Sequence, residues 1–227
     1  MIKKTIERSN LSAFDKLTTA FIPRNSRVLD LGSGSGRIGG YLKENLGCKV
    51  IGAEINKKVA KTAKMYLDDV IVGNLEDKDI QQMILKRGKF DVILASAILE
   101  HLKEPEKFLK EIINALSKDA IILITLPNVA FWQIRFNLLY GKFDYTYSGI
   151  LDKGHLHLYT LKSAREFIKK DCRLKIDKIE FDFPEVPILH YIKLVPVIGK
   201  KLNYWLYRKF PTFFAYQFLF VCAKKLA

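Results

Sequence analysis

An open α/β fold, in which helices cover both faces of a parallel sheet, is predicted by three features of the sequence. Short apolar runs recur along the chain, helical patterns separate them, and each run is apolar on both faces of the strand it predicts. The five runs are RVLDL, KVIGAE, DVIVG, FDVILAS and AIILITL. Strands that are apolar on both faces are typical of parallel sheets buried between two helix layers, so a doubly wound sheet is the expected architecture.

The helices of this fold are predicted by apolar residues at helical spacing. A leading amphipathic helix is expected to end at Pro23, and Pro105, a residue type favoured in a first helical turn, is expected to begin another. Val129 to Tyr140 forms a further helical pattern, and Thr160 is a suitable N-cap for LKSAREFIKK. The apolar positions of the first three helices are Leu11, Phe14, Leu17, Phe21 and Ile22, then Ile38, Tyr41, Leu42 and Leu46, then Phe108, Leu109, Ile112 and Leu116.

Composition favours one domain, because 227 residues with 49% hydrophobic content are enough for a single core. The basic start MIKKTIERSN has no apolar stretch behind it, so no secretory signal is expected. FFAYQFLFVCA, an apolar run near the end, has eleven residues, fewer than the roughly 20 that span a bilayer as a helix. Cys48, Cys172 and Cys222 match no ligand spacing, so neither disulfides nor a metal site is predicted. A cytoplasmic protein, at most peripheral to a membrane, is expected.

The formal charge of +14 favours anionic partners through its long-range field. Nucleic acid, an anionic membrane surface and a phosphorylated substrate all carry such charge. From Pro184 onward, seven Lys or Arg residues accompany a single acid, Glu185. Aromatic side chains are interleaved with them, namely Tyr191, Tyr204, Trp205, Tyr207, Phe210, Phe213 and Phe214. A solvated basic face explains this segment as well as a partner surface does, so charge alone leaves the partner open.

The stretch VLDLGSGSGRIGG places Asp30 inside an apolar strand, just before a glycine-rich loop. A carboxylate at a buried strand end is costly unless a donor or cation meets it, so a ligand is the expected partner. The loop after the first strand is the usual ligand site of such sheets. A GxGxxG match begins at Gly34, but counted from Gly32, directly after the strand, Arg37 stands at the third glycine of this dinucleotide pattern. A ligand with an ammonium group explains Asp30 better.

The loop resembles the first motif of the class I S-adenosylmethionine (SAM)-dependent methyltransferases, E/D-x-G-x-G-x-G, which Asp30, Gly32, Gly34 and Gly36 match. The resemblance implies SAM as cofactor, S-adenosylhomocysteine (SAH) as product, and Ser33 as a further binding residue of the loop. It also implies a Rossmann-like, mostly parallel sheet of seven strands in the order 3-2-1-4-5-7-6. KIDKIEFDF is then the sixth strand and FAYQFLFVCAKK an antiparallel last strand.

The end of the second strand extends the resemblance. Glu54 stands 22 residues after Gly32, where the family has an acid that holds both ribose hydroxyls, and Ile55 follows it as a further cofactor residue. Taken singly, Asp30 and Glu54 each fit a structural role as well as a binding role. Together they favour a ligand that has an amine at one end and a ribose in the middle.

Two later motifs complete a resemblance that covers residues 27–126. Asn74 stands where the family commonly has an Asp that meets the adenine amino group, with the Leu75 amide nearby. Asn also supplies an acceptor oxygen, so the replacement is mild. Ser96 and Ala97 follow the fourth strand, where the resemblance places them beside the methionine moiety.

Methyl transfer from a sulfonium is a one-step displacement, so the protein mainly aligns the acceptor and excludes water, and no metal is demanded. The segment ASAI stands in place of the N/D-P-P-Y/F element with which relatives methylate nucleobase amino groups. Methylation of amino groups in nucleic acid is therefore disfavoured, whereas other RNA chemistry stays open. His101, in LEHL, is interpreted as a helix-start residue packed against the sheet, with direct catalysis as the alternative.

The segment after the fifth strand is expected to form the acceptor side of the site. It is similar to a GxFDYxxxGILDxxHLRxFT element of a methyltransferase subgroup associated with cell-surface polysaccharide or lipid-linked glycan biosynthesis, with His157 in place of the usual Arg. His155 is the candidate general base, because imidazole accepts a hydroxyl proton near neutral pH. A rigid loop in which Asp152 and His155 only bond the backbone is the alternative. The expected reaction is O-methylation of a small or glycan-like acceptor.

The whole chain, 1–227, is expected to form a single methyltransferase domain. Its parts are an N-terminal helix (1–24), a cofactor-binding core (25–126), an acceptor-side insertion (127–160) and a basic aromatic insertion (184–211). The last part suits an anionic membrane surface, a lipid-phosphate acceptor or a homodimer contact. Two other functions stay open, namely a non-catalytic cofactor-binding partner subunit and a methyltransferase directed to RNA.

Overall fold

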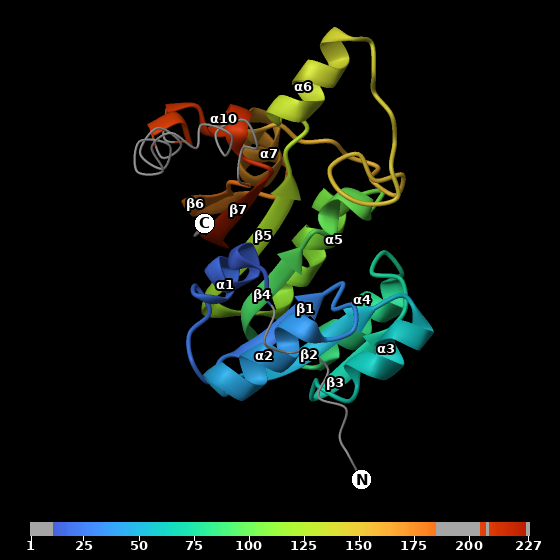
Figure 1. The fold of residues 1–227 in the computed structure, drawn as a ribbon. Helices are drawn as coiled ribbons and strands as arrows, with labels where there is room; N and C mark the ends of the chain where they lie inside the picture. The colour runs from blue at the N-terminus through green and yellow to red at the C-terminus, as the bar shows by residue number, and fades with distance from the viewer. Residues whose placement is uncertain (1–10, 185–204, 208, 226–227) are drawn as a thin grey trace.

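A seven-stranded sheet forms the centre of the computed structural model, which describes residues 11–184, 205–207 and 209–225 (Figure 1). The strands are β1 (Arg27–Leu31), β2 (Lys49–Glu54), β3 (Asp69–Val72), β4 (Phe90–Ser96), β5 (Leu116–Pro127), β6 (Leu174–Asp182) and β7 (Gln217–Lys224). Their order is β3-β2-β1-β4-β5-β7-β6. The pairs among β1 to β5 are parallel, and β7 is antiparallel to both β5 and β6. The predicted strand order and directions are confirmed.

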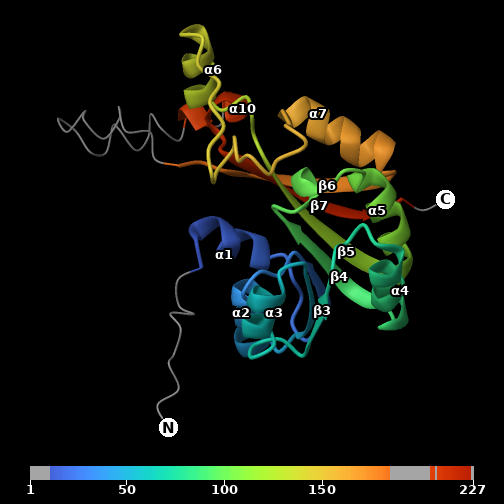
Figure 2. The same cartoon turned by 90° about the vertical axis from the view of Figure 1, so that its right-hand side faces the viewer.

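Helices cover both faces of the sheet (Figure 2). One layer contains α1 (Ala13–Thr19), α2 (Arg37–Leu46) and α3 (Lys57–Ala63), and the other contains α4 (Lys78–Lys86), α5 (Pro105–Ile112), α7 (Leu161–Glu166) and the π-helical turn η3 (Phe167–Asp171). Successive strand residues alternate between the layers: Val28 packs in the cluster under α2, and Leu29 packs in the cluster under α5. This alternation explains why the strand runs are apolar on both faces.

The acceptor-side insertion leaves the sheet after β5. Its helix α6 (Trp132–Leu139) projects from the body of the molecule beside α10 (Pro211–Phe214) (Figure 1). The inner side of this segment forms a small cluster of its own, in which Phe131, Ile134 and Ile150 are buried. The insertion is therefore anchored by its own apolar contacts above the carboxyl ends of the strands.

Three predicted helix boundaries are wrong and two are confirmed. Helix α1 ends at Thr19 and does not reach Pro23, whereas Pro105 begins α5 as predicted. Leu116 begins β5 and does not lie on α5, because a 3₁₀ turn, η2 (Ile113–Ala115), redirects the chain. Helix α6 begins at Trp132 and not at Val129, because the Val129 N–H donates to the Tyr159 carbonyl instead of entering a helix. Thr160 caps α7 as predicted, with its hydroxyl accepting from the Ser163 N–H at 3.2 Å.

Most of the predicted basic aromatic insertion, including Tyr191 and Tyr204, lies outside the described residues. Its described aromatic residues pack on one another and on the end of β6. The Phe183 and Tyr207 rings stack 4.6 Å apart, and the Trp205 and Phe210 rings meet edge to face at 6.4 Å. Within the described part of the chain, no helix is both long enough and apolar enough to cross a membrane.

Candidate active site

The glycine-rich loop begins where β1 ends, beside the point at which the strand order reverses between β1 and β4. The loop folds over the end of β2, since the Gly32 and Ser33 N–H groups both donate to the Ala53 carbonyl, at 2.9 and 3.0 Å. Gly34 has a φ of +54°, which side chains rarely adopt. A Cβ atom on Gly34 would meet no atom within 4 Å, so the backbone faces open space there.

Asp30 is the buried acid of this loop region, with 3% of its surface exposed. None of the described residues donates a hydrogen bond to its carboxyl group. Burial, and to a smaller extent the charge of Glu54, raises the pKa of Asp30 to about 7. A cation or hydrogen-bond donor from a ligand would stabilise the ionised form of Asp30. As the sequence implies, the described residues do not themselves supply this partner.

Glu54 closes β2 and holds two loops. Its Oε2 accepts from the Gly34 N–H at 3.0 Å, and its Oε1 accepts from the Asn56 N–H at 2.8 Å. Each carboxylate oxygen accepts more than one hydrogen bond, so Glu54 retains acceptor capacity for hydroxyl groups. Ile55 beside it is 65% exposed, which places an apolar surface at the same edge of the sheet.

Asn74 and Leu75 follow β3 on the far side of Glu54. The Asn74 Oδ1 accepts from the Glu76 N–H at 3.1 Å, and the buried Leu75 offers its carbonyl to the Gln81 Nε2 at 2.9 Å. These bonds fix the loop and the direction of the Asn74 amide. The amide oxygen retains one lone pair for a ligand.

Ser96 is the last residue of β4, the strand next to β1, and Ala97 follows it. Ala97 has a φ of +49°, a left-handed conformation that is strained for a residue other than glycine. The Thr125 side chain holds this conformation, since its Oγ1 accepts from the Ala97 N–H at 2.9 Å and lies 3.4 Å from the Ser96 Oγ. Backbone strain that is held in this way is common at functional sites.

Two pockets bring these residues together, and both are lined by Gly32 and Ala97. The first, of 370 Å³, is also lined by the predicted residues Asp30, Ser33, Gly34 and Ser96. The second, of 320 Å³, is also lined by the predicted residues Glu54, Ile55, Asn74 and Leu75. Residues from the ends of four strands, which are far apart in the sequence, thus line two neighbouring pockets.

Gly36 is the predicted cofactor residue that borders neither pocket. It is the N-cap residue of α2, with a φ of +81°. A Cβ atom on Gly36 would lie 3.1 Å from the Ala63 Cα, so glycine is needed here for close packing of α2 on α3. The motif glycine has a structural explanation at this position.

The loop that carries His155 is fastened to η1 (Leu99–His101), the 3₁₀ turn after β4. The Leu156 and His157 N–H groups donate to the Glu100 carbonyl, at 2.8 and 3.2 Å. The His155 Nδ1 lies 2.9 Å from the Ile150 carbonyl. A carbonyl only accepts, so this bond places the proton on Nδ1 and the lone pair on Nε2. Burial lowers the pKa of His155, which favours this neutral form near pH 7.

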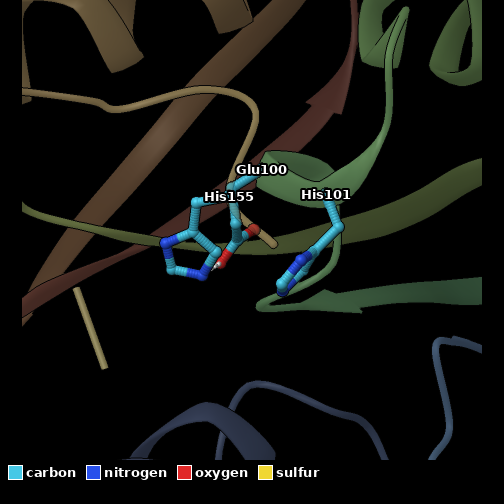
Figure 3. A group of neighbouring side chains, drawn as sticks. All are labelled: Glu100, His101 and His155. Carbon is cyan, nitrogen blue, oxygen red and sulfur yellow. Dashed lines mark ion pairs between the residues drawn. The ribbon is translucent and has the colours of Figure 1, made fainter. Parts of the chain in front are cut away.

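Glu100 is a buried acid that the motifs did not reveal. It is fully buried, and both of its carboxylate oxygens lack a hydrogen-bond partner. Burial raises the pKa of Glu100 to about 7. The His155 Nε2 lies 4.0 Å from the Glu100 Oε1 (Figure 3). The available signal was an acid directly before a histidine in LEHL, next to a strand end.

His101 belongs to the same group, and its interpretation as a residue packed against the sheet is wrong. It is exposed on η1, lines the second pocket, and lies edge-on to His155 with the ring centres 4.7 Å apart. Its Nδ1 lies 3.0 Å from the Gly154 carbonyl. The acceptor-side loop thus brings His155 next to the wall of the second pocket.

Residues 5–170 match a protein-family model described as a methyltransferase domain. The chain belongs to this methyltransferase family. The matched range contains β1 to β5, all residues named above for the two pockets, and the cluster of Glu100, His101 and His155. The family match therefore covers the candidate site itself.

Two curated relatives of this methyltransferase act on different atoms according to their names. It is 27% identical over 191 residues to the glycine/sarcosine/dimethylglycine N-methyltransferase of Actinopolyspora halophila, an alignment of 80% of this chain and 31% of that relative. It is 32% identical over 108 residues to the ubiquinone biosynthesis O-methyltransferase of Pelagibacter ubique, an alignment of 46% of this chain and 43% of that relative. The chain thus aligns with less than half the length of either relative.

A solved structure shows the same fold. The methyltransferase resembles the crystal structure of a SAM-dependent methyltransferase from Archaeoglobus fulgidus with a TM-score of 0.60 and 19% identity, over 93% of each chain. At this identity the likeness concerns the fold alone.

The residues of the two pockets fit SAM as a cofactor. Asp30 lacks a donor, and the Ser33 Oγ is buried without a hydrogen-bond partner in the same pocket, so both can bind the polar amino-acid end of the ligand. Glu54 has acceptor capacity for ribose hydroxyls, and the open space beside Gly34 allows a ligand to approach the backbone. The exposed face of Ile55 suits a flat base.

Proposed function

We propose that the protein transfers the methyl group of SAM to an oxygen atom of a small or glycan-like acceptor. The observation that supports this most is the placement of two acids, Asp30 in one pocket and Glu54 in the next, on either side of the open backbone at Gly34. This arrangement suits a ligand that is cationic at one end and carries hydroxyl groups in its middle. When bound, SAM supplies a methyl group on a positively charged sulfur.

The preference for a hydroxyl acceptor rests on His155. The neutral imidazole keeps its Nε2 lone pair free and lies against His101, which lines the second pocket. We propose that an acceptor hydroxyl that reaches past His101 gives its proton to this Nε2. The oxygen–carbon bond then forms while the carbon–sulfur bond breaks, and the electron pair of that bond stays on sulfur. The insertion that carries His155 is the part of the chain that resembles glycan-associated methyltransferases, which supports a glycan-like acceptor.

Calorimetry with a matched pair of glycine variants tests the cofactor. Gly34→Leu is expected to lower SAH affinity at least about 100-fold, because the side chain fills the open space of the first pocket. Gly88→Leu is the control, because Gly88 also has a positive φ and open space at its Cβ, but lies before β4, away from both pockets. Both variants should lose about 1–2 kcal/mol of stability from backbone strain. Equal SAH affinity in the two variants would place the cofactor elsewhere.

The alternatives predict different binding results. NAD serves as the dinucleotide control, and NAD binding as tight as SAH binding would contradict the proposal. Tight SAH binding with no methyl transfer across a panel of phenols, hydroxy acids, glycosides and amines would favour a non-catalytic partner subunit. Filter binding of RNA that exceeds binding to anionic lipid would favour an RNA-directed enzyme.

We further propose that the α6 end of the molecule contacts an anionic membrane surface. Large apolar side chains on α6 and the loop after it are 49% to 88% exposed, namely Phe136, Leu138, Leu139, Tyr140, Tyr145 and Tyr147. Arg135, Lys142 and Lys153 are exposed among them. Apolar side chains with basic neighbours on a protein of charge +14 suit an interface with anionic lipid.

Vesicle sedimentation tests this contact. Leu139→Glu is expected to weaken binding to phosphatidylserine-containing vesicles about tenfold, because it removes an inserted side chain and adds a like charge to the lipid. Met65→Glu is the control, since Met65 is 66% exposed on a different part of the surface. Binding of the native protein should fall as salt is added. Absence of native binding at low salt, or a concentration-dependent dimer that Leu139→Glu dissociates, would overturn the membrane contact.

A further inference from the structure

Glu100 is a buried carboxyl group to which no described residue donates a hydrogen bond. It is fully buried on η1, and neither oxygen has a hydrogen-bond partner. Burial of an unpaired carboxylate costs several kcal/mol, so groups of this kind are normally paired or bound to a cation. The group that the structure places next to it is the His155 Nε2, at 4.0 Å, which is beyond hydrogen-bond distance.

Two imidazoles lie beside this carboxyl group, and both have the same tautomer. The Nδ1 atoms of His155 and His101 each lie at hydrogen-bond distance from a backbone carbonyl, of Ile150 at 2.9 Å and of Gly154 at 3.0 Å. Both bonds place the proton on Nδ1 and leave the Nε2 lone pair free. A backbone carbonyl that fixes the tautomer and the ring direction is typical of metal-binding histidines.

The three side chains converge (Figure 3). One potential ligand atom from each of Glu100, His101 and His155 lies within 4.8 Å of those of the other two. Metal–ligand bonds are about 2 Å long, so each side chain would move inward by roughly 1 Å to share one ion. Small rotations of three side chains that meet beside a pocket wall are enough for this.

We propose that Glu100, His101 and His155 form a binding site for a divalent transition-metal cation of the zinc class. Two imidazoles and one carboxylate are a ligand set that Zn²⁺ uses in catalytic sites, where a further position stays open for substrate. Imidazole nitrogen also disfavours Mg²⁺ and Ca²⁺, which prefer oxygen ligands. The buried carboxylate then has the positive partner that the protein itself does not supply.

A metal ion at this site would bind and activate the methyl acceptor, an inference that rests on the proposed function. His101 lines the second pocket, so an open metal position would be accessible from there. A cation held by these three side chains would lower the pKa of an acceptor hydroxyl that it binds, so that the hydroxyl proton could pass to solvent water. The oxygen–carbon bond would then form as the carbon–sulfur bond of SAM breaks, with the electron pair of that bond left on sulfur. The His155 Nε2 has one lone pair, so it serves either as a metal ligand or as the base.

Metal titration of the untagged full chain, freed of metal by a chelator, tests the site. Zn²⁺ is titrated by calorimetry, and Co²⁺ is followed by its visible absorption. His155→Ala and Glu100→Gln are expected to weaken binding at least about tenfold and to change the Co²⁺ spectrum. His157→Ala is the matched control, because His157 is a nearby imidazole whose Nε2 lies 3.3 Å from the Lys103 carbonyl. If Glu100→Gln does not fold, His101→Ala replaces it as the second ligand variant, because His101 is exposed.

SAH calorimetry on the same samples separates the two proposals. Metal binding that all variants retain, or no binding of Zn²⁺ and Co²⁺ by a native protein that binds SAH, would overturn the metal site and leave His155 as the base. A native protein that binds the metal but not SAH would overturn the proposed function. Metal-dependent turnover that the chelator abolishes and Zn²⁺ or Co²⁺ restores is the expected result.

Discussion

Asp30→Asn is expected to lower SAH affinity about 100-fold at pH 8. The change keeps the shape of the side chain and removes the negative charge that faces the first pocket. A hydrogen bond between charged groups contributes about 1.5–3 kcal/mol, which corresponds to roughly one to two powers of ten in affinity. Asp119→Asn is the control, because Asp119 is exposed near the start of β5, at the opposite edge of the sheet. Isothermal calorimetry measures both variants.

The pH dependence should distinguish an ionised partner from a neutral one. Because the pKa of Asp30 is raised to about 7 in the ligand-free protein, the carboxyl group is mostly protonated at pH 6 and mostly ionised at pH 8. An ammonium group stabilises the ionised form, so native SAH affinity should rise through this range and binding should release a proton. Three other charged groups act near Asp30, namely Glu54 through its charge and Asp15 and Arg37 in the lining of the same pocket. All three are unchanged in Asp30→Asn. The difference in pH dependence between the native protein and Asp30→Asn therefore reports on Asp30 alone.

The same substitution should stabilise the ligand-free protein at high pH. The folded-state pKa of Asp30, about 7, lies above its ordinary value of 3.8, so the fold favours the protonated form. Stability from this group is complete below about pH 4 and is lost as pH rises to about 7, a change on the order of 4 kcal/mol. Urea unfolding should show Asp30→Asn more stable than the native protein at pH 8 and similar to it at pH 4. If SAH binding by Asp30→Asn had the same pH dependence as SAH binding by the native protein, Asp30 would not be part of the cofactor site.

His155→Ala is expected to lower turnover by about 10² to 10⁴ while SAH affinity stays within about twofold. Loss of a group that handles the acceptor proton costs this much, whether the lone pair of Nε2 takes the proton or holds a cation that promotes its loss. The side chain lies behind His101 at the acceptor side and not among the residues proposed to hold the cofactor. The readout is SAH formed from SAM with an acceptor that the panel identifies.

The control for this experiment is His157→Ala. His157 lies two residues away on the same loop, and its ring stacks with that of Tyr159 outside the cluster of acids and imidazoles. Its turnover should stay close to that of the native protein. Turnover of His155→Ala within twofold of native would show that the acceptor loses its proton without help from this residue.

The fold, and the meeting of the residues that we propose to bind the cofactor, could be predicted because their signals are local. Asp30, Glu54, Asn74 and Ser96 each stand at the end of a short apolar run, and parallel strands bring their carboxyl ends to one edge. Knowing where each strand ends was therefore enough to place these side chains together. Gly36 shows the limit, since its glycine serves helix packing although it belongs to the same motif.

The cluster on the acceptor side could not be predicted because its signal is not local. Glu100 and His155 meet through backbone hydrogen bonds that join the Leu156 and His157 N–H groups to the Glu100 carbonyl. Neither the spacing of apolar residues nor the order of the strands predicts these hydrogen bonds. The sequence pattern predicts that His101 packs against the sheet and gives no role to Glu100, yet in the 3₁₀ turn His101 is exposed and Glu100 is fully buried. Long-range contacts of a loop are what pattern-based reasoning does not capture.

The two hydrogen bonds of Glu54 have a consequence for the speed of ligand capture. They join the Gly34 and Asn56 N–H groups to one side chain, so bonds within the protein itself hold both loops in place. Encounter with the nucleoside then requires little loss of chain entropy and no slow rearrangement. Association should accordingly be limited by diffusion and orientation, and differences in affinity among related nucleosides should lie in their dissociation rates.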